Sequence, residues 1–114
     1  MIYNTTEKQR EYFYSMLKKK KKSLLKYIPT VNGLLDFAVE HFADLPAISD
    51  GKTTYTYKEL GERVAKRCGY LKSLNFNQGD RIAVFAPNTL DAMELYLAIV
   101  TSGYVSVMLP TQLN

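Results

Sequence analysis

Few side chains in this sequence are of the types that catalyse reactions or bind metal ions. The chain has one histidine, His41, and one cysteine, Cys68. A zinc site usually needs three or four ligands, so these two residues predict no metal centre. His41 lies beside the apolar stripe of a predicted helix and is interpreted as structural or solvated. Cys68 lies on such a stripe and is interpreted as a small hydrophobe, not a nucleophile.

Two carboxylates, Glu59 and Asp80, are further candidates for acid–base chemistry. Each has a structural explanation, because Glu59 completes a helix-capping motif and Asp80 lies in a turn after Gly79. No glycine-rich sequence opens a helix with a lysine behind it, so no phosphate-binding loop is predicted. The sequence therefore predicts no catalytic, cofactor-binding or metal-binding residue in this chain, and no cofactor bound by it.

The elements that would position a site are centred on a predicted strand–helix–strand unit at residues 79–110. Residues 81–86 (RIAVFA) and 104–109 (YVSVML) are short apolar runs, and the first is typical of a strand buried on both faces. Two such strands joined by a helix are almost always parallel with a right-handed crossover.

The helix between these strands is predicted to start after Pro87, where Asn88 or Thr89 is a suitable N-cap. Gly103 is expected to end it, because glycine can turn left-handed without a Cβ clash. Apolar residues at three- and four-residue steps predict the buried stripe, which comprises Leu90, Met93, Leu97 and Val100, with Tyr96 alongside.

A helix at residues 31–42 and a hairpin are predicted upstream. The helix has Thr30 as its expected N-cap and an apolar face made of Val31, Leu34, Leu35, Ala38, Val39 and Phe42. The hairpin spans residues 47–56, and Asp50-Gly51 are expected to form a two-residue primed turn with positive φ angles.

A third helix follows the hairpin directly. Thr56 and Glu59 have the spacing of a capping box, in which each side chain satisfies a free amide of the first turn. Gly61 and Gly69 are expected to permit the close approach of a neighbouring element. The apolar stripe of this helix is predicted at Leu60, Val64, Cys68 and Leu71.

Length and composition favour one α/β domain, with a mostly parallel sheet, flanking helices and a short β-hairpin. Residues 1–30 carry eight Lys/Arg and two Asp/Glu (+6), whereas residues 31–114 carry seven and nine (−2). We therefore divide the chain into a basic helical leader at 1–29 and a partial domain at 30–114. This distribution argues against nucleic-acid binding by the folded domain. A lone cysteine and no recognisable signal sequence favour the cytoplasm.

The leader contains a run of five lysines. Basic residues of this kind are attracted to anionic lipid by about 1 kcal/mol each near the surface. A solvated helix or arm is the alternative interpretation, and a charge run alone is a weak signal. The predicted contact is therefore a weak one with anionic membranes through Lys18, Lys19, Lys20, Lys21 and Lys22.

Four segments, in order, resemble the start of the adenylate-forming (AMP-binding) superfamily, which includes acyl-CoA synthetases and peptide-synthetase adenylation domains. Residues 45–51 (LPAISDG) are similar to the family's "pAi…dg" strand, and residues 55–60 (YTYKEL) to its first core motif, L-[TS]-Y-x-E-L. Residues 79–88 (GDRIAVFAPN) resemble "GDrVai…pN", and residues 97–109 resemble the second core motif. Met108 departs from the family pattern, where proline is usual, which leaves the register of the last strand open.

The resemblance implies the first part of the large N-terminal domain of an ATP-dependent carboxylate–CoA ligase. Such enzymes form an acyl-adenylate from Mg-ATP and then transfer the acyl group to a thiol, so ATP, Mg and CoA are implied for the parent protein. The residues that bind these groups in the family have no counterpart here, and we expect a truncated, inactive fragment. The entry segment at residues 25–30 (LKYIPT) favours a fatty or medium-chain acid as the substrate.

Three alternatives remain open at this point. One is the start of an amino-acid-activating adenylation domain that loads a carrier protein. Another is a non-enzymatic basic module that docks on membranes, and the third is a stand-alone remnant that keeps only an interaction role. A strand left without a neighbour after Leu109 predicts self-association of the fragment. The sequence identifies neither the acid nor the acceptor.

Overall fold

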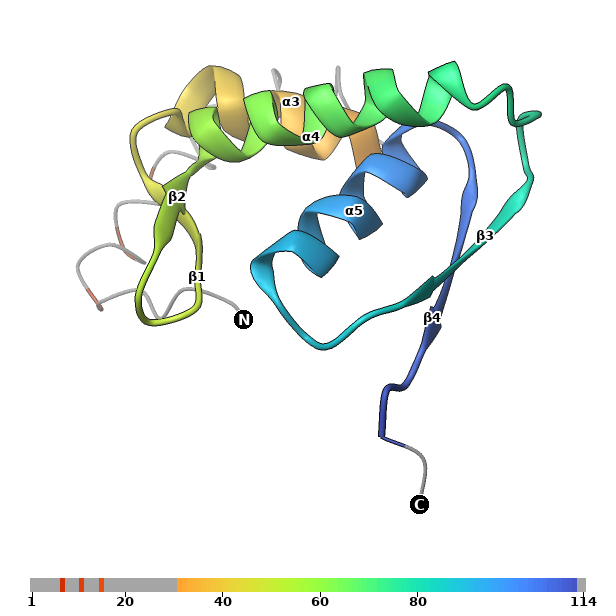
Figure 1. Ribbon diagram of the computed structural model, residues 1–114. Helices are drawn as coiled ribbons and strands as arrows, with labels where there is room; N and C mark the ends of the chain where they lie inside the picture. Colours follow the sequence, from red (N-terminus) through yellow and green to blue (C-terminus); the bar gives the residue numbers. More distant parts are fainter. Residues whose placement is uncertain (1–6, 8–10, 12–14, 16–30, 113–114) are drawn as a thin grey trace.

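The computed structural model describes residues 7, 11, 15 and 31–112 of the 114-residue chain. Most of the predicted leader helix, the Thr30 cap and the lysine run lie outside these residues. The elements, in chain order, are α3 (Val31–Phe42), β1 (Pro46–Ser49), β2 (Thr54–Thr56), α4 (Tyr57–Ser73), β3 (Arg81–Phe85), α5 (Leu90–Thr101) and β4 (Val105–Leu109), as Figure 1 shows.

The strand–helix–strand unit is confirmed. β3 and β4 pair in parallel without interruption, from Arg81 opposite Val105 to Phe85 opposite Leu109. Thr89, not Asn88, caps α5, since its hydroxyl accepts a hydrogen bond from the amide of Ala92 at 3.2 Å.

The end of α5 is also as predicted. Gly103 has φ +85°, a conformation that favours glycine. Its amide donates to the carbonyl of Val100, and the amide of Tyr104 donates to the carbonyl of Ile99. This pair of bonds defines a Schellman motif, which satisfies carbonyls that the helix end would otherwise leave free.

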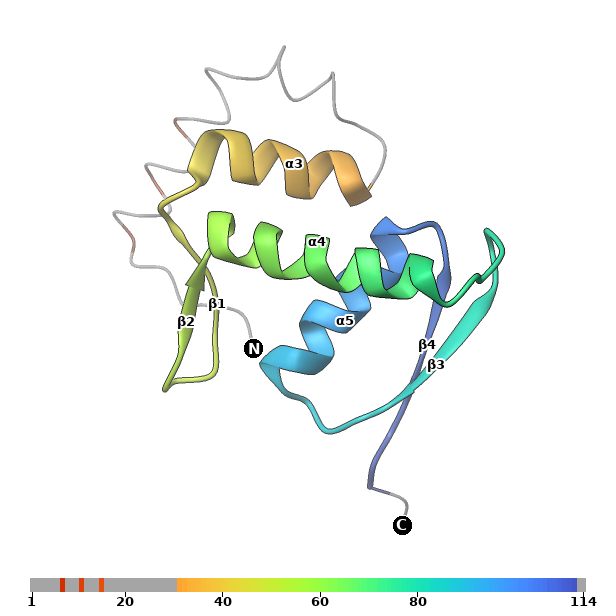
Figure 2. The same ribbon diagram turned by 45° about the horizontal axis from the view of Figure 1, so that its top comes forward.

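The helices and the parallel pair are stacked in layers. α4 lies between α3 and α5, and α5 packs on the β3–β4 pair, as Figures 1 and 2 show from two directions. The buried core runs through these layers and includes Ile48, Leu60, Val64, Leu71, Val84, Leu90, Ala98, Ile99 and Tyr104. The α/β fold class is confirmed, with the hairpin forming a separate two-stranded sheet.

The prediction that the first strand is buried on both faces is wrong for these residues. Along β3 only Val84 is buried, with Ile82 half-buried, while the alternate residues are exposed. The cause is that α5 covers one face of the pair only. β4 follows this only in part. Val105, Val107 and Leu109 are exposed on the side away from α5, but Met108, on the side turned toward α5, is 48% exposed as well.

The buried stripe of α5 is broader than the predicted one. Leu90 is buried as expected, but Ala98 and Ile99 are the most deeply buried apolar residues, and Tyr96 is 38% exposed. The reason is that α5 packs against α4 on one side and against the strands on another. A single stripe at three- and four-residue steps describes a helix with one packed side.

The buried face of α3 also differs from the prediction. Phe37 is 3% exposed, whereas Leu34, which was placed on the apolar face, is 54% exposed. α3 packs along α4, where Val39 lies against Gly61 and Leu35 packs onto the core. The predicted apolar face of α3 is therefore wider than its contact with α4, and Leu34 lies outside that contact.

The hairpin forms, but its turn is longer than predicted. β1 and β2 are antiparallel, with Ser49 opposite Thr54 and an irregularity between Pro46 and Ile48. The connection is residues 50–53, and Gly51 has φ +90° while Asp50 has no positive φ. A primed two-residue turn needs positive φ at both central residues. The Asp50 carboxylate shapes this turn instead, accepting bonds from the amides of Lys52 and Thr53.

The capping box of α4 is confirmed. Thr56 Oγ1 accepts from the amide of Glu59 at 3.2 Å, and Glu59 Oε1 accepts from the amide of Thr56 at 3.3 Å. Close approach is confirmed at Gly61, where an added Cβ would lie 2.7 Å from Val39 Cγ2. It is wrong at Gly69, which has no atom of a neighbour within 4 Å of that position.

Candidate functional site

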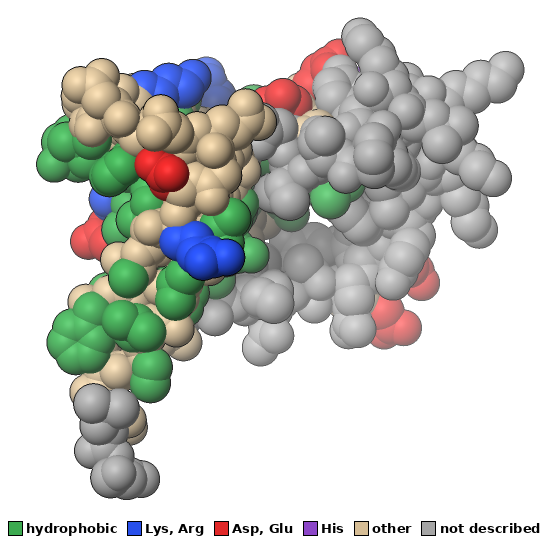
Figure 3. All heavy atoms as spheres, turned by 90° about the vertical axis from the view of Figure 1, so that its right-hand side faces the viewer, with side chains coloured by type: hydrophobic (Ala, Val, Ile, Leu, Met, Phe, Trp, Pro, Cys, Tyr) green, Lys and Arg blue, Asp and Glu red, His purple; other side chains and the backbone are tan. Residues whose placement is uncertain are grey.

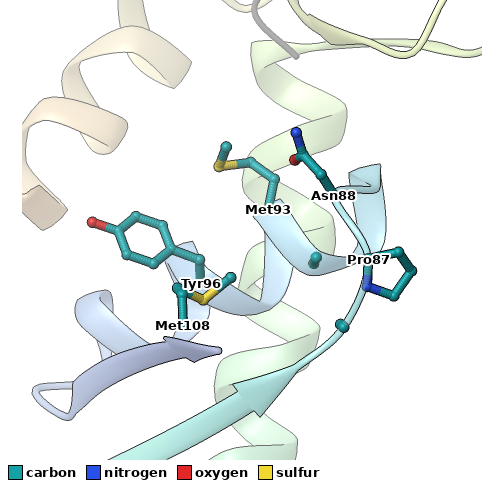
Figure 4. A pocket seen from close by; sticks show the side chains of 7 residues that line it. Pro87, Asn88, Met93, Tyr96 and Met108 are labelled. Atoms are coloured by element: carbon teal, nitrogen blue, oxygen red, sulfur yellow. The ribbon is translucent and has the colours of Figure 1, made fainter. Parts of the chain in front are cut away.

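An apolar hollow of about 340 Å³ lies at the carboxyl ends of β3 and β4. In open α/β sheets this end of the strands is where ligands usually bind. Figure 4 shows that its lining comes from three elements, namely the segment after β3, the first half of α5, and β4. The lining residues are Ala86, Pro87, Asn88, Ala92, Met93, Tyr96 and Met108.

Local sequence explains how these side chains are placed. Pro87 cannot continue the ladder of β3, and the Thr89 cap starts α5 directly afterwards. Met93 and Tyr96 are three residues apart and share one side of the helix. Met108 joins them from β4, since it lies on the strand face turned toward α5 together with Ser106, whose hydroxyl is 3.4 Å from its sulfur.

The chemistry available in this hollow is that of binding. Its polar side-chain groups are the Asn88 carboxamide and the Tyr96 phenol, and neither forms an acid–base pair with a neighbour among the described residues. An apolar lining with few polar groups is typical of sites that hold an apolar moiety and orient it. Catalysis by the Tyr96 phenol would need a neighbouring base to activate it, which the other lining residues do not supply.

An ionic cluster centred on one buried carboxylate joins α4 to α5. Glu94 of α5 is fully buried, and its two carboxylate oxygens accept bonds from Arg63 Nε at 2.5 Å and Arg67 Nε at 2.9 Å. Arg67 Nη2 also donates to Asp91 Oδ1 at 2.9 Å. The Arg63 guanidinium lies 4.5 Å from the centre of the Tyr55 ring, which extends the cluster to the hairpin.

The charges of this cluster balance, with two arginines facing two carboxylates. A buried carboxylate is costly unless it is paired and hydrogen-bonded, and here both oxygens of Glu94 have a partner. The bond to Glu94, and the charges of Glu94 and Asp91, raise the pKa of Arg63. Both guanidinium groups are engaged with carboxylates, so the cluster holds α5 against α4.

The sequence did contain a signal for this cluster. Glu94 falls four residues after Leu90 and four before Ala98, in the middle of the buried stripe of α5. A charged residue at such a position needs a partner. Arg63 and Arg67, one turn apart on the preceding helix, are the matching pair, and this spacing was missed.

Of the residues first considered for chemistry, two carboxylates have the predicted structural roles. Glu59 belongs to the capping box of α4. Asp80 shapes the turn before β3, where its Oδ2 accepts a bond from the amide of Asn77 at 2.8 Å. Gly79 in the same turn has φ +84°.

His41 and Cys68 lie apart from the apolar hollow. The His41 ring is half-buried and lies 4.6 Å from that of Phe37. Cys68 Sγ is 3.6 Å from the carbonyl oxygen of Ala98 and 3.3 Å from Thr101 Oγ1. The thiol borders a second hollow, of about 370 Å³, lined by Leu35, Asp36, Gly61, Val64, Ala65, Cys68, Gly69, Lys72 and Thr101.

In the part of the chain that the structure describes, no three His, Cys, Asp or Glu side chains gather where they could hold a metal ion. Arg63 and Arg67 are engaged with the carboxylates of Glu94 and Asp91. No described helix is both long and apolar enough to cross a membrane.

Comparison with known protein families gives a direct assignment. A family described as AMP-binding enzyme matches residues 35–114, which include β1–β4, α4, α5 and most of α3. The match covers well over half of the chain, and it includes the segments on which the resemblance was based. The chain belongs to the AMP-binding enzyme family.

Curated relatives agree with this assignment. The chain is 44% identical over 55 residues to an acetyl-coenzyme A synthetase of Herminiimonas arsenicoxydans, across 47% of the chain and 8% of that protein. It is 31% identical over 77 residues to a peroxisomal benzoate–CoA ligase of Arabidopsis thaliana, across 68% and 13%. It is 37% identical over 67 residues to the phenyloxazoline synthase MbtB of a Mycobacterium species, across 59% and 6%. The chain therefore matches only a small part of each relative.

Solved structures share the fold. The N-terminal subdomain of NpsA from Klebsiella oxytoca superposes with a TM-score of 0.72 at 22% identity, across 76% of this chain and 23% of that one. VinN in complex with L-aspartate gives a TM-score of 0.71 at 25% identity, across 77% and 25%. The arrangement of α3, the hairpin, α4 and the parallel unit is thus one that known proteins adopt.

Proposed function

We propose that the protein to which this chain belongs is an ATP-dependent ligase that activates a carboxylic acid and transfers it to a thiol, with a fatty or medium-chain acid and coenzyme A as the preferred pair. The observation that carries the proposal is the family match over residues 35–114. Support for coenzyme A comes from relatives named acetyl-coenzyme A synthetase and benzoate–CoA ligase. ATP, Mg and CoA belong to the whole protein in this proposal.

The role proposed for this chain is to frame the active domain. Its described residues provide a parallel strand pair, a helix locked to that pair, and an apolar hollow at the carboxyl ends of the strands. In this proposal the Mg-ATP site lies in other parts of the whole protein, so the chain alone is expected to be inactive. Titration of Mg-ATP into the 114-residue chain should release no heat, and tight nucleotide binding would contradict this placement of the site.

The decisive experiment uses the complete natural gene product. Purified protein is incubated with Mg-ATP, coenzyme A and single acids, namely acetate, octanoate, palmitate and benzoate, and pyrophosphate release and thioester are measured. The proposal expects pyrophosphate and a coenzyme A thioester with octanoate or palmitate. Pyrophosphate release with acetate or benzoate, but not with octanoate or palmitate, would support an acid-activating ligase and contradict the preference for fatty or medium-chain acids. The absence of pyrophosphate release with every acid, and with the twenty amino acids, would reject the class.

The second candidate is an amino-acid-activating domain that loads a carrier protein. The observation that favours it is the 37% identity to a phenyloxazoline synthase, together with the similar fold of VinN, which was solved with L-aspartate. The same assay separates the two candidates. Amino-acid-dependent pyrophosphate exchange without a coenzyme A thioester would favour this one.

Weak docking on anionic membranes is a third proposal, and it rests on the lysines at residues 18–22, which lie outside the described residues. The chain is pelleted with phosphatidylserine vesicles at low and high salt. Binding at low salt that high salt removes is expected, since the attraction is screened. A chain that stays in the supernatant at low salt would reject this idea.

A further inference from the structure

A second hollow lies among three helices, and it shares no lining residue with the hollow at the carboxyl ends of the strands. Its volume is about 370 Å³, which is within the size range of pockets that enclose a bound group. Its lining comes from α3, α4 and the last residue of α5, and the α4 side includes Gly61, Ala65 and Gly69 at four-residue steps. We call it the helical hollow. Ala65 and Gly69 are exposed, so the described residues leave this part of α4 uncovered.

α3 covers only the first part of this row of small residues. The two helices run in opposite directions, as Figure 2 shows, and Val39 lies against Gly61. Val31, the first residue of α3, is eight residues before Val39, and Gly69 is eight residues after Gly61. Each interval is about 12 Å of helix. The amino end of α3 is therefore level with Gly69, where an added Cβ would meet no atom within 4 Å.

The chain that precedes α3 is consequently attached at the open end of the helical hollow. Residues 24–30 (LLKYIPT) are mostly apolar and lie outside the described residues. Pro29 disfavours helical geometry at the residue before it, so the sequence favours an extended segment here over a continuation of α3. An extended residue covers about 3.3 Å. Tyr27, four residues before Val31, is thus close enough to reach any point along the hollow.

Attachment and composition favour this segment as the occupant. A short tether raises the effective concentration of the attached group to the millimolar range. The hollow offers mainly apolar contacts, among them Leu35, Val64 and Cys68, and the burial of apolar side chains against them is favourable. The segment belongs to the 114-residue chain itself, so this cover requires no further part of a longer protein.

We propose that residues 24–29 turn back along the end of α4 and fill the helical hollow with the side chains of Leu25 and Tyr27. Residues two apart point to the same side of an extended chain, so Lys26, between them, faces water. The folded unit then begins before residue 30. The thiol of Cys68, which borders the hollow, is covered by the segment.

The reactivity of Cys68 tests whether the hollow is filled. This thiol is the only one in the chain, and its alkylation by iodoacetamide under native conditions is followed by mass spectrometry. Tyr27→Asp should increase the rate at least tenfold over the wild-type chain, because a charged side chain is costly to place in an apolar hollow. Lys26→Asp is the matched control, with the same new side chain one residue away, and should retain the slow rate. Circular dichroism verifies that all three chains are folded.

A disulfide tests the position of the segment directly. Tyr27→Cys and Leu25→Cys each add a second thiol on the side proposed to face Cys68. A mild oxidant at low protein concentration should convert at least the Tyr27→Cys pair to an intramolecular disulfide, which requires Cα atoms within about 7 Å. Lys26→Cys, on the opposite side, should cross-link at least tenfold more slowly. Equal rates at positions 26 and 27 would overturn the proposed orientation.

Three results would overturn the proposal as a whole. Equally fast alkylation of Cys68 in the wild-type chain and in Tyr27→Asp would indicate that the hollow stays open, and that another part of a longer protein or a small apolar ligand fills it. Equally slow alkylation in both, without a disulfide at position 25 or 27, would indicate that α4 and α5 alone shield the thiol. A rate that rises as much in Lys26→Asp would remove the specific role of Tyr27. None of these results affects the proposed ligase activity, which is measured on the complete gene product.

Discussion

The two sides of the β3–β4 pair differ in how completely they are packed. On the inner side α5 covers Val84, which is buried, and α5 is itself fixed to α4 through the buried side chain of Glu94. On the outer side, Phe85 and Val105 keep about half or more of their surface exposed. The same strands thus pack into the core on the side that α5 covers and leave an exposed apolar surface on the other side, in the region where Figure 3 shows hydrophobic side chains gathered.

This difference shows that apolar content does not by itself predict burial. A strand residue is buried only where another element covers its face, and in the described residues α5 is the element that does so. Stability should therefore depend strongly on the inner side and weakly on the outer one. Substitutions on the two sides provide a direct test of that expectation.

The largest effect is expected at the Glu94 cluster. Replacing Arg63 and Arg67 together with Met leaves a buried carboxylate without a partner, and should cost about 3–5 kcal/mol in the free energy of unfolding. Glu94→Ala should cost somewhat less, about 3 kcal/mol, because the two arginines are partly exposed and can turn to water. Urea unfolding followed by circular dichroism measures both values.

Two controls sharpen this prediction. Val107→Ala on the outer side should change the free energy of unfolding by less than about 1 kcal/mol, because the side chain is already partly in water. The triple replacement of Arg63 and Arg67 with Met and of Glu94 with Leu should recover most of the lost stability. A loss at Val107 as large as that at Glu94 would contradict the difference between the two sides.

A smaller effect is expected from two glycines of α4. Gly61→Ala places a methyl group against Val39, and the strain should cost about 1–3 kcal/mol, partly offset by a gain of about 1 kcal/mol in helix propensity. Gly69→Ala meets no neighbour and should show the gain alone. Thermal unfolding of the two variants gives the difference directly, and equal melting temperatures would show that α3 yields at this contact.

The smallest effect is expected at the hairpin turn. Bonds from the amides of Thr53 and Lys52 lower the pKa of Asp50, so the charged carboxylate stabilises the fold. A lowered pKa gives stability that is present above the unfolded value of about 3.9 and is lost as the pH falls through the folded one. The difference in stability between the wild-type chain and Asp50→Asn should therefore be constant from pH 7 to about 5 and shrink toward pH 2. A difference that grows in acid would contradict this sign.

Local rules predicted several features correctly. The capping box at Thr56, the helix end at Gly103 and the strands flanking α5 each depend on a few adjacent residues whose chemistry has one main solution. The family resemblance depended on such segments too, and the family match confirmed it. These elements could be predicted from the sequence because each is determined by residues adjacent in the chain.

Features that depend on packing were not predictable in this way. The exposure of Leu34, the burial of Glu94 and the open face of β3 are decided by which element lies opposite, and that is a property of the whole fold. The apolar hollow was missed for the same reason, because Met93, Tyr96 and Met108 meet only after the strands pair. Of these features, only the burial of Glu94 could have been predicted, because a charged residue within an apolar stripe indicates a buried ion pair.

The position of Arg63 has a consequence for how the molecule opens. Its guanidinium lies over the Tyr55 ring of the hairpin and holds Glu94 of α5, so one side chain of α4 is shared by two segments that are distant in sequence. Fraying of the hairpin removes the contact of Arg63 with the Tyr55 ring, and detachment of α5 removes its bond to Glu94. Amide protons of β2 and α5 should then exchange with deuterium as one cooperative unit, with similar opening free energies.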